Sequence, residues 1–147
     1  MNEAVQPMDS LPFSHILRDT ADADEHAACL TNWQQQYDQL SAGPFAGEFE
    51  EFCFGNVQVF REALNQSVHQ AGLAWPGSRT FAVPTAIEGS GWYGGETYTA
   101  HSMLTLGAGD ELDFRTPRRL EVLACTADAA ALDAYALQVD HRNLEAE

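Results

Sequence analysis

The pattern of apolar and polar positions divides the chain into two helical segments and a longer strand-rich segment between them. Over residues 22–40, largely apolar side chains recur at intervals of three and four: His26, Leu30, Trp33, Tyr37 and Leu40. This spacing places them on one face, so we predict a helix over this range. Asp22, with Glu25 three residues later, resembles a capping box at its start, and Gly43-Pro44 ends it.

From residue 45 to about residue 125 the pattern changes to short alternating runs. Turn residues such as Gly55-Asn56, Pro76-Gly77 and Gly94-Gly95 separate them. The runs are 47–50, 57–59, 81–83, 101–106, 112–114 and 120–122. Several short strands at roughly ten-residue spacing predict an antiparallel β-sandwich or β-barrel.

A second helix is predicted over residues 126–140, where the helical spacing returns. One face carries an apolar stripe of Leu132, Tyr135, Ala136 and Val139. The stripe has two interpretations: it contacts a second copy of the chain in a homodimer, or it packs on its own sheet. Together, the two helical segments and the strand-rich segment between them, residues 22–140, are predicted to form one domain. Residues 1–21 are predicted to form an arm, with a short strand over 14–17, and residues 141–147 to begin a linker.

Charge and cysteine content narrow the function classes. Among the 147 residues, 22 are acidic and seven are arginine, with no lysine, which gives a formal charge of −15. This balance opposes phosphate binding, so we expect no nucleic-acid binding by this chain. The three widely spaced cysteines predict reduced thiols rather than disulfides or a zinc site. No signal peptide and no apolar run of ~20 residues are present, which favours a soluble, cytoplasmic protein without a membrane partner.

Catalytic motifs are not recognisable in the sequence. His69 and His101 are more than thirty residues apart, and the other histidines lie in the arm and the two predicted helices, so no metal is expected. The chain has no GxSxG elbow and no P-loop. The cysteines have apolar or acidic neighbours, which should raise their thiol pKa values. We therefore expect neither an enzyme nor a cofactor.

An ordered set of residues carries a family resemblance. The set is Asp24-Glu25-His26-Ala27-Ala28 with Trp33, Tyr37, Gln39, Leu40 and Ser41, then Phe45-Ala46-Gly47, Gln58-Val59-Phe60-Arg61-Glu62 and Trp75-Pro76-Gly77. It resembles the amino-terminal domain of AraC-type transcription regulators, in the subgroup of ethanolamine-operon regulators and their relatives. The turn at 106–111 resembles one found in cupin-like barrels. The resemblance implies an α+β fold, in which a cupin-like antiparallel β-barrel or sandwich is flanked by an N-terminal and a C-terminal helix.

The strand-rich segment also holds side chains suited to a small-molecule site. Five of them are candidate ligand-binding residues: Arg61, His69, Trp75, Phe81 and Trp92. Aromatic groups supply most of the wall of such sites, and a few polar groups such as Arg and His orient the ligand. The alternative is that the aromatic residues are core and that Arg61 is a strand charge paired with Glu62 or Glu48.

The resemblance implies a regulatory domain that binds a small-molecule effector and forms a homodimer. Such a domain contacts DNA only through a C-terminal helix-turn-helix domain, which is absent from this sequence. Two alternatives stay open. One is a stand-alone, non-metal cupin enzyme acting on a small metabolite, and the other is a dimerisation module without a ligand.

Overall fold

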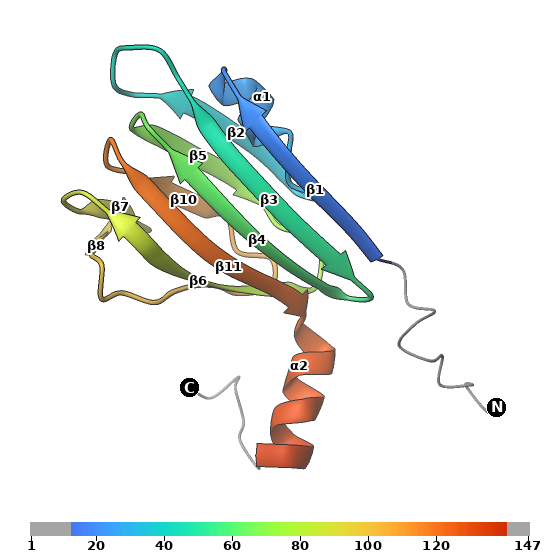
Figure 1. Cartoon of the computed structure of the whole chain (residues 1–147). Coiled ribbons are helices and arrows are strands. Elements are labelled where there is room, and N and C mark those ends of the chain that lie inside the picture. Colours follow the sequence, from blue (N-terminus) through green and yellow to red (C-terminus); the bar gives the residue numbers. More distant parts are fainter. Residues whose placement is uncertain (1–12, 141–147) are drawn as a thin grey trace.

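Two antiparallel sheets face each other in the computed structural model, which describes residues 13–140 (Figure 1). The six-stranded sheet has the order β1-β3-β4-β11-β6-β9, and the five-stranded sheet has the order β2-β5-β10-β7-β8. The predicted antiparallel sandwich is therefore confirmed. The barrel does not form, because the strands belong to two separate open sheets rather than one closed one.

The strands are longer and more numerous than the sequence pattern predicts. The first sheet consists of β1 (Phe13–Thr20), β3 (Gly47–Phe54), β4 (Val57–Leu64), β11 (Leu120–Asp128), β6 (Ser78–Ile87) and β9 (Leu104–Leu106). The second consists of β2 (Gln34–Gln39), β5 (Val68–Leu73), β10 (Leu112–Arg115), β7 (Gly91–Tyr93) and β8 (Glu96–Tyr98). Strands were predicted within β1, β3, β4, β6, β9, β10 and β11, whereas β2, β5, β7 and β8 were not predicted.

Alternation in β4 shows how the sequence sets the two faces of the larger sheet. Every second residue is buried between the sheets: Gln58, Phe60, Glu62 and Leu64. Because successive side chains of a strand point to opposite faces, Val59 and Arg61 lie on the outer face. The β3–β4 hairpin turns at Gly55, whose φ of 58° favours glycine. Two of the four inward positions are polar, which is unusual for a core strand.

The core between the sheets consists of three clusters. One joins α1 (Ala23–Ala27) to β2, β4 and β5 and contains Ala23, Ala27, Tyr37, Phe45, Leu64 and Val68. The second contains Cys29, Leu30, Phe49, Phe60 and Ala124. The third, at the other end of the sandwich, contains Tyr98, Phe114, Leu120 and Val122. The second and third clusters contribute residues to the wall of the cavity described below.

The predicted N-terminal helix over residues 22–40 is wrong beyond its first turn and a half. Asp22 caps α1 as expected, and its carboxylate accepts hydrogen bonds from the amides of Asp24 and Glu25. The helix ends at Ala27, and Asn32 has a φ of 63° that no helix tolerates. The following residues form β2, which pairs with β5 along its whole length. Strand pairing therefore overrides a helical spacing that occurs in the sequence.

The predicted C-terminal helix and the predicted N-terminal arm also have different bounds in the structure. Residues 126–128 belong to β11, so helix α2 begins later and spans Ala129–Tyr135, followed by a π-helical segment, η2 (Ala136–Asp140). The strand predicted over residues 14–17 of the arm is confirmed, and it is part of the longer β1, which pairs with β3 from Phe13 to Thr20. The rest of that arm (1–12) and the predicted linker (141–147) lie outside the described residues. Within residues 13–140, no helix is long and apolar enough to cross a membrane.

Candidate ligand-binding cavity

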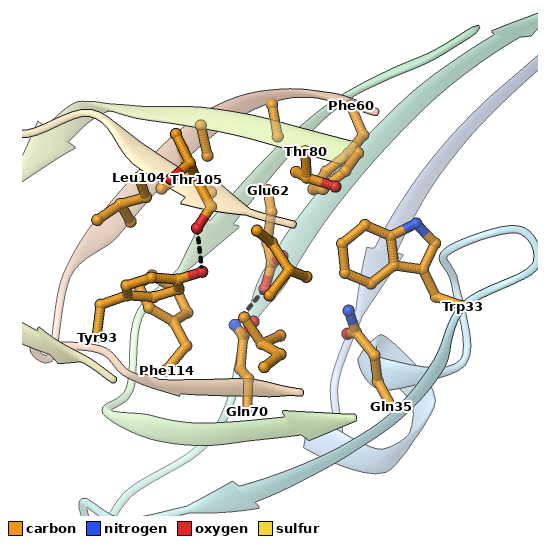
Figure 2. A pocket seen from close by; sticks show the side chains of 15 residues that line it. Trp33, Gln35, Phe60, Glu62, Gln70, Thr80, Tyr93, Leu104, Thr105 and Phe114 are labelled. Carbon is orange, nitrogen blue, oxygen red and sulfur yellow. Dashed lines mark hydrogen bonds between the residues drawn. The ribbon is translucent and has the colours of Figure 1, made fainter. Parts of the chain in front are cut away.

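A partly open cavity lies between the two sheets of the sandwich. Its volume is about 60 Å³, several times the ~10–15 Å³ that one water molecule requires. Figure 2 shows side chains from both sheets converging on it. The lining residues are Trp33, Gln35, Phe60, Glu62, Gln70, Thr80, Ala82, Tyr93, Leu104, Thr105, Leu106, Leu112, Phe114, Val122 and Ala124.

Most of the cavity wall is aliphatic or aromatic. Phe60 and Val122 contribute from the six-stranded sheet, and Phe114 faces them from the five-stranded sheet. Tyr93 closes one side, where its hydroxyl donates to the carbonyl oxygen of Thr105 at 2.5 Å and so joins the two sheets (Figure 2). Burial raises the pKa of Tyr93, which keeps this phenol protonated as a donor. The wall therefore suits an apolar group.

Glu62 gives the cavity one polar end. Its side chain is buried, and its Oε1 accepts a hydrogen bond from Gln70 Nε2 at 2.8 Å (Figure 2). The Tyr37 hydroxyl lies 3.0 Å from Oε1 and 3.1 Å from Oε2 of the same carboxylate. Burial, and next the nearby Glu62, raise the pKa of Tyr37 well above its ordinary value, so the phenol stays protonated and donates. A carboxylate with two neutral donors is thus held at the cavity.

His26 connects this carboxylate to the start of the domain. The imidazole is completely buried, and its Nδ1 is hydrogen bonded to the Thr20 hydroxyl at 2.7 Å. Its Nε2 lies 3.4 Å from Glu62 Oε1 but makes no hydrogen bond there. Gly47 makes this position possible, because a Cβ there would collide with the imidazole and lie 2.6 Å from the Thr20 hydroxyl oxygen. The end of β1 and the start of β3 therefore pack against the His26 imidazole.

Trp33 and Gln35 line the cavity next to this polar end (Figure 2). Trp33 packs edge-on against Phe60, and its Nε1 donates to Gln58 Oε1 at 2.8 Å. These contacts fix the indole against the six-stranded sheet. Gln35 differs, because its Oε1 is buried and has no hydrogen-bond partner within residues 13–140. Buried amide oxygens are nearly always paired, so this atom is an acceptor that a cavity occupant can use.

A second buried carboxylate, Glu51 on β3, has a different environment. It is completely buried and accepts hydrogen bonds from the Thr31 amide at 3.0 Å, the Thr31 hydroxyl, the Cys53 thiol at 3.0 Å and Gln58 Nε2 at 3.1 Å. Its two oxygens therefore have the donors that a carboxylate needs. Glu51 does not line the cavity. We interpret it as the anchor of the loop between α1 and β2.

The two charged ligand-binding candidates lie outside the cavity. Arg61 is on the outer face of β4, where its Nη1 is 3.5 Å from Glu48 and 3.6 Å from Glu121. Pairing with Glu48 is one of the alternatives that the sequence left open. His69 is on the outer face of β5, with its Nε2 2.8 Å from the Asp113 carboxylate. Neither residue lines the cavity.

The three aromatic candidates are also dispersed. Phe81 is on the outer face of β6, paired with Cys125 of β11. Trp75 is half-buried and precedes the Pro76-Gly77 turn before β6, while Trp92 on β7 is 53 % exposed. The structure brings none of the five predicted residues to the cavity, and their role as ligand contacts stays a prediction.

The predicted dimer stripe on the C-terminal helical segment is only partly accessible. Tyr135 and Val139 are 59 % and 54 % exposed, Leu132 is half-buried, and Ala136 is buried within its own chain. Tyr135 and Val139 are therefore available to a partner, whereas Ala136 is not. Contact with a second copy stays a prediction.

The cysteines and histidines of the described part of the chain form no recognisable reactive centre. Cys29, Cys53 and Cys125 are free thiols, as predicted. Burial raises the pKa of each, to about 11 for Cys53, where Glu51 contributes as well. The expectation of raised thiol pKa values is therefore confirmed. Within residues 13–140, no three His, Cys, Asp or Glu side chains are grouped to hold a metal ion.

Sequence reasoning missed the residues that define the polar end of the cavity. Glu62 belongs to the quoted motif, but its role was not recognised, and Gln35 and Gln70 were not considered. The sequence did contain one signal for this site. The inward face of β4 carries an acidic residue, Glu62, in an alternating series with Gln58, Phe60 and Leu64. Acidic side chains are almost never fully buried without a partner, so such a position marks a special site.

Comparison with known proteins assigns no function to this cavity. No protein-family model matches the chain, and no solved structure matches it. The observations that bear on function are the cavity, its buried carboxylate and the resemblance of the sequence to AraC-type regulators.

Proposed function

We propose that this chain is the effector-binding and dimerisation domain of an AraC-type transcription regulator, whose effector occupies the cavity between the sheets. The observation that carries the proposal is the mostly apolar interior cavity with the buried carboxylate of Glu62 at one end. Small-molecule sites commonly combine an apolar wall with a few polar groups that orient the ligand. The sequence resemblance supplies the regulatory role, in which DNA is contacted through a C-terminal domain outside this sequence.

The residues at the cavity favour binding over catalysis. In the described part of the chain, Glu62 is the one carboxylate among the lining residues, and these include no Cys, His or Ser. Covalent catalysis needs an activated nucleophile, and general acid–base catalysis needs positioned groups that exchange protons. The phenol of Tyr93 is engaged with a carbonyl oxygen and has a raised pKa. The proposed domain is therefore a sensor rather than an enzyme.

Strand β11 provides the route from the cavity to the proposed dimer contact. Val122 and Ala124 line the cavity, and the same strand ends at Asp128, whose carboxylate caps α2 through the Ala131 amide at 2.9 Å. A ligand that changes the spacing of the sheets would move β11 and with it the helix. Such a ligand shifts the regulator only to the extent that it prefers one arrangement over the other.

A thermal-shift screen with a cavity-filling variant tests the proposal. Amino alcohols, amino acids, sugars and cobalamins are screened against the wild-type chain and against Ala82→Leu, which places a larger side chain in the cavity wall. A ligand at a hundred times its dissociation constant stabilises the native state by ~2.7 kcal/mol. For a chain of this size the midpoint should rise by roughly 5–10 °C.

Ala63→Leu is the matched control, because Ala63 faces outward on β4 and does not line the cavity. The response should be lost in Ala82→Leu and kept in Ala63→Leu, with circular dichroism confirming that both variants are folded. A compound that stabilises all three proteins equally binds elsewhere and contradicts the proposed site. If no class of compound produces a shift in the wild-type chain, the dimerisation module without a ligand becomes the better interpretation.

A further inference from the structure

We infer that the free edge of β1 binds an extended segment of another protein, which adds a strand to the six-stranded sheet and carries apolar residues together with a lysine or an arginine. The site is separate from the cavity and independent of the proposed effector. Three properties of β1 point to this partner: a long free edge, exposed apolar side chains beside that edge, and a carboxylate without an ionic partner.

Strand β1 lies at one edge of the six-stranded sheet (Figure 1). Within residues 13–140 it pairs on one side only, with β3, in an unbroken register from Phe13 to Thr20. In an edge strand, the backbone N–H and C=O groups of about every second residue point away from the sheet, where they can pair with another chain. The eight residues of β1 therefore offer a pairing edge for a peptide of similar length.

The other edge strands of the described sandwich are protected. Strands β8 and β9 have three residues each, and five of the six residues of β2 are glutamine or aspartate. Natural proteins protect an edge with a short strand, with charged residues or proline, or with a bulge. β1 contains neither lysine nor proline, and its pairing with β3 has no bulge. It is therefore the edge at which we place a partner strand.

The outer face of β1 supplies apolar contacts for such a strand. Phe13 and Leu17 are 66 % and 64 % exposed, and Phe54, opposite Phe13 on β3, is 41 % exposed. Side chains that lie directly opposite each other on paired strands are about 4.5–5.5 Å apart at Cβ. Apolar residues of an added strand, placed opposite Phe13 and Leu17, would cover both side chains and remove them from water.

Asp19 sets the charge of the partner. It lies on the same outer face, directly opposite Glu48 of β3, and like charges in this position destabilise a strand pair. Arg61 Nη1 lies 3.5 Å from Glu48, but no basic side chain within residues 13–140 forms an ion pair with Asp19. A lysine or arginine opposite Asp19 supplies that charge. The formal charge of −15 also attracts a cationic segment and repels a second copy of the chain.

The probe is an octapeptide with blocked termini, in which lysine comes first and threonine and valine then alternate. In an antiparallel register its lysine lies opposite Asp19, and its valines lie opposite Leu17, His15 and Phe13. With this peptide bound to the wild-type chain, the backbone amides of residues 13–20 should exchange with deuterium more slowly. The amides of β9, at the other edge of the same sheet, should exchange at an unchanged rate.

Two control peptides separate backbone pairing from charge. One has glutamate in place of lysine, and the other is methylated on the backbone nitrogens of every threonine and valine, so that these amides cannot donate hydrogen bonds. By calorimetry, the lysine peptide should bind about three- to tenfold more tightly than the glutamate peptide, because opposite charges attract across paired strands and like charges repel. The methylated peptide should not bind, since it cannot pair with the edge.

Two matched pairs of variants place the peptide on β1. Leu17→Lys adds a charge at the edge and should weaken binding of the lysine peptide at least about fivefold. Leu123→Lys makes the same change on the central strand β11, where the leucine is 44 % exposed, and should have no effect. Asp19→Asn should reduce the preference for lysine over glutamate to less than about twofold, whereas Asp113→Asn, in the other sheet, should preserve it.

Unchanged hydrogen exchange at residues 13–20, binding of the methylated peptide, or equal affinity for the lysine and glutamate peptides would overturn the inference. If the same amides become protected when the chain alone is concentrated, a second copy occupies the edge, and the inference of a separate cationic segment fails. The comparison of the three peptides uses the wild-type chain, so it holds even if a variant fails to fold.

Discussion

Replacing Tyr37 with Phe removes one hydroxyl from the buried carboxylate of Glu62 and leaves the aromatic ring in place. Tyr37 is 2 % exposed and packs in the cluster between α1, β2 and β5. Its hydroxyl lies 3.0 and 3.1 Å from the two carboxylate oxygens. Without this hydroxyl, Gln70 Nε2 is the remaining hydrogen-bond donor to the carboxylate within residues 13–140.

The expected cost follows from the charge of the acceptor. A hydrogen bond to a charged group contributes about 1.5–3 kcal/mol, and one between neutral groups contributes about 0.5–1.5 kcal/mol. Tyr37→Phe should therefore destabilise the chain by about 1.5–3 kcal/mol, which lowers the melting temperature by roughly 3–12 °C. Tyr93→Phe is the matched control, because it removes a hydroxyl from a neutral carbonyl oxygen. It should cost about half as much or less.

Urea denaturation followed by circular dichroism measures both variants, and Glu62→Gln completes a double-mutant cycle. With a neutral amide at position 62, the cost of Tyr37→Phe should fall to about 0.5–1.5 kcal/mol. If Tyr37→Phe costs the same with Glu62 and with Gln at this position, or no more than Tyr93→Phe, the buried charge that we assign to Glu62 is refuted.

The stability difference between the wild-type chain and Tyr37→Phe depends on pH. The pKa of Tyr37 is raised in the folded chain, first by burial and then by Glu62, so the folded state binds the phenol proton more tightly than the unfolded state. The stability from this effect is complete below about pH 10, the ordinary tyrosine value, and is lost as the pH rises towards the folded value. The difference in free energy of unfolding between the wild-type chain and Tyr37→Phe should therefore become smaller above pH 10.

Two further predictions concern the cysteines and the helix. Burial and Glu51 raise the pKa of Cys53 to about 11. At pH 8, iodoacetamide should therefore alkylate Cys53 about a hundredfold more slowly in the folded chain than in the urea-unfolded chain. Equal alkylation rates, measured by peptide mass spectrometry, would contradict the raised pKa. The wild-type chain should sediment as a dimer at tens of micromolar and Leu132→Glu/Tyr135→Glu as a monomer, because the contact would bury unpaired charge. Ala134→Glu, at an exposed position of α2, is the control, and a monomeric wild type would refute the dimer.

The sequence predicted the sandwich because alternation persists through β3, β4 and β11, where one face is buried and turns separate the strands. It failed at residues 34–39, where Trp33, Tyr37 and Leu40 also fit a helical spacing. The deciding interaction is pairing with β5, far along the chain, which no local pattern contains. Tertiary contacts commonly override local propensity in this way.

The candidate site was harder to predict because both faces of the six-stranded sheet carry apolar residues. Phe60 points inward and Val59 outward, and Phe81 and Val83 are apolar on the outer face. When both faces are apolar, alternation alone does not show which residues meet in the interior, and an error of one residue exchanges the faces. Arg61 was therefore considered for the cavity, whereas the inward side chain is its neighbour Glu62.

The two buried glutamates, Glu51 and Glu62, have different environments, which distinguish a structural carboxylate from a candidate ligand-binding one. Glu51 and Glu62 lie on adjacent strands of one sheet, and both are at most 3 % exposed. Glu51 has four donors from its own chain and no contact with the cavity, so its desolvation is compensated by the fold alone. Glu62 has two donors, and it faces a cavity. Since the same chain can satisfy a buried carboxylate fully, the two donors of Glu62, with His26 Nε2 3.4 Å away, support the proposal that a ligand contacts this carboxylate at the cavity.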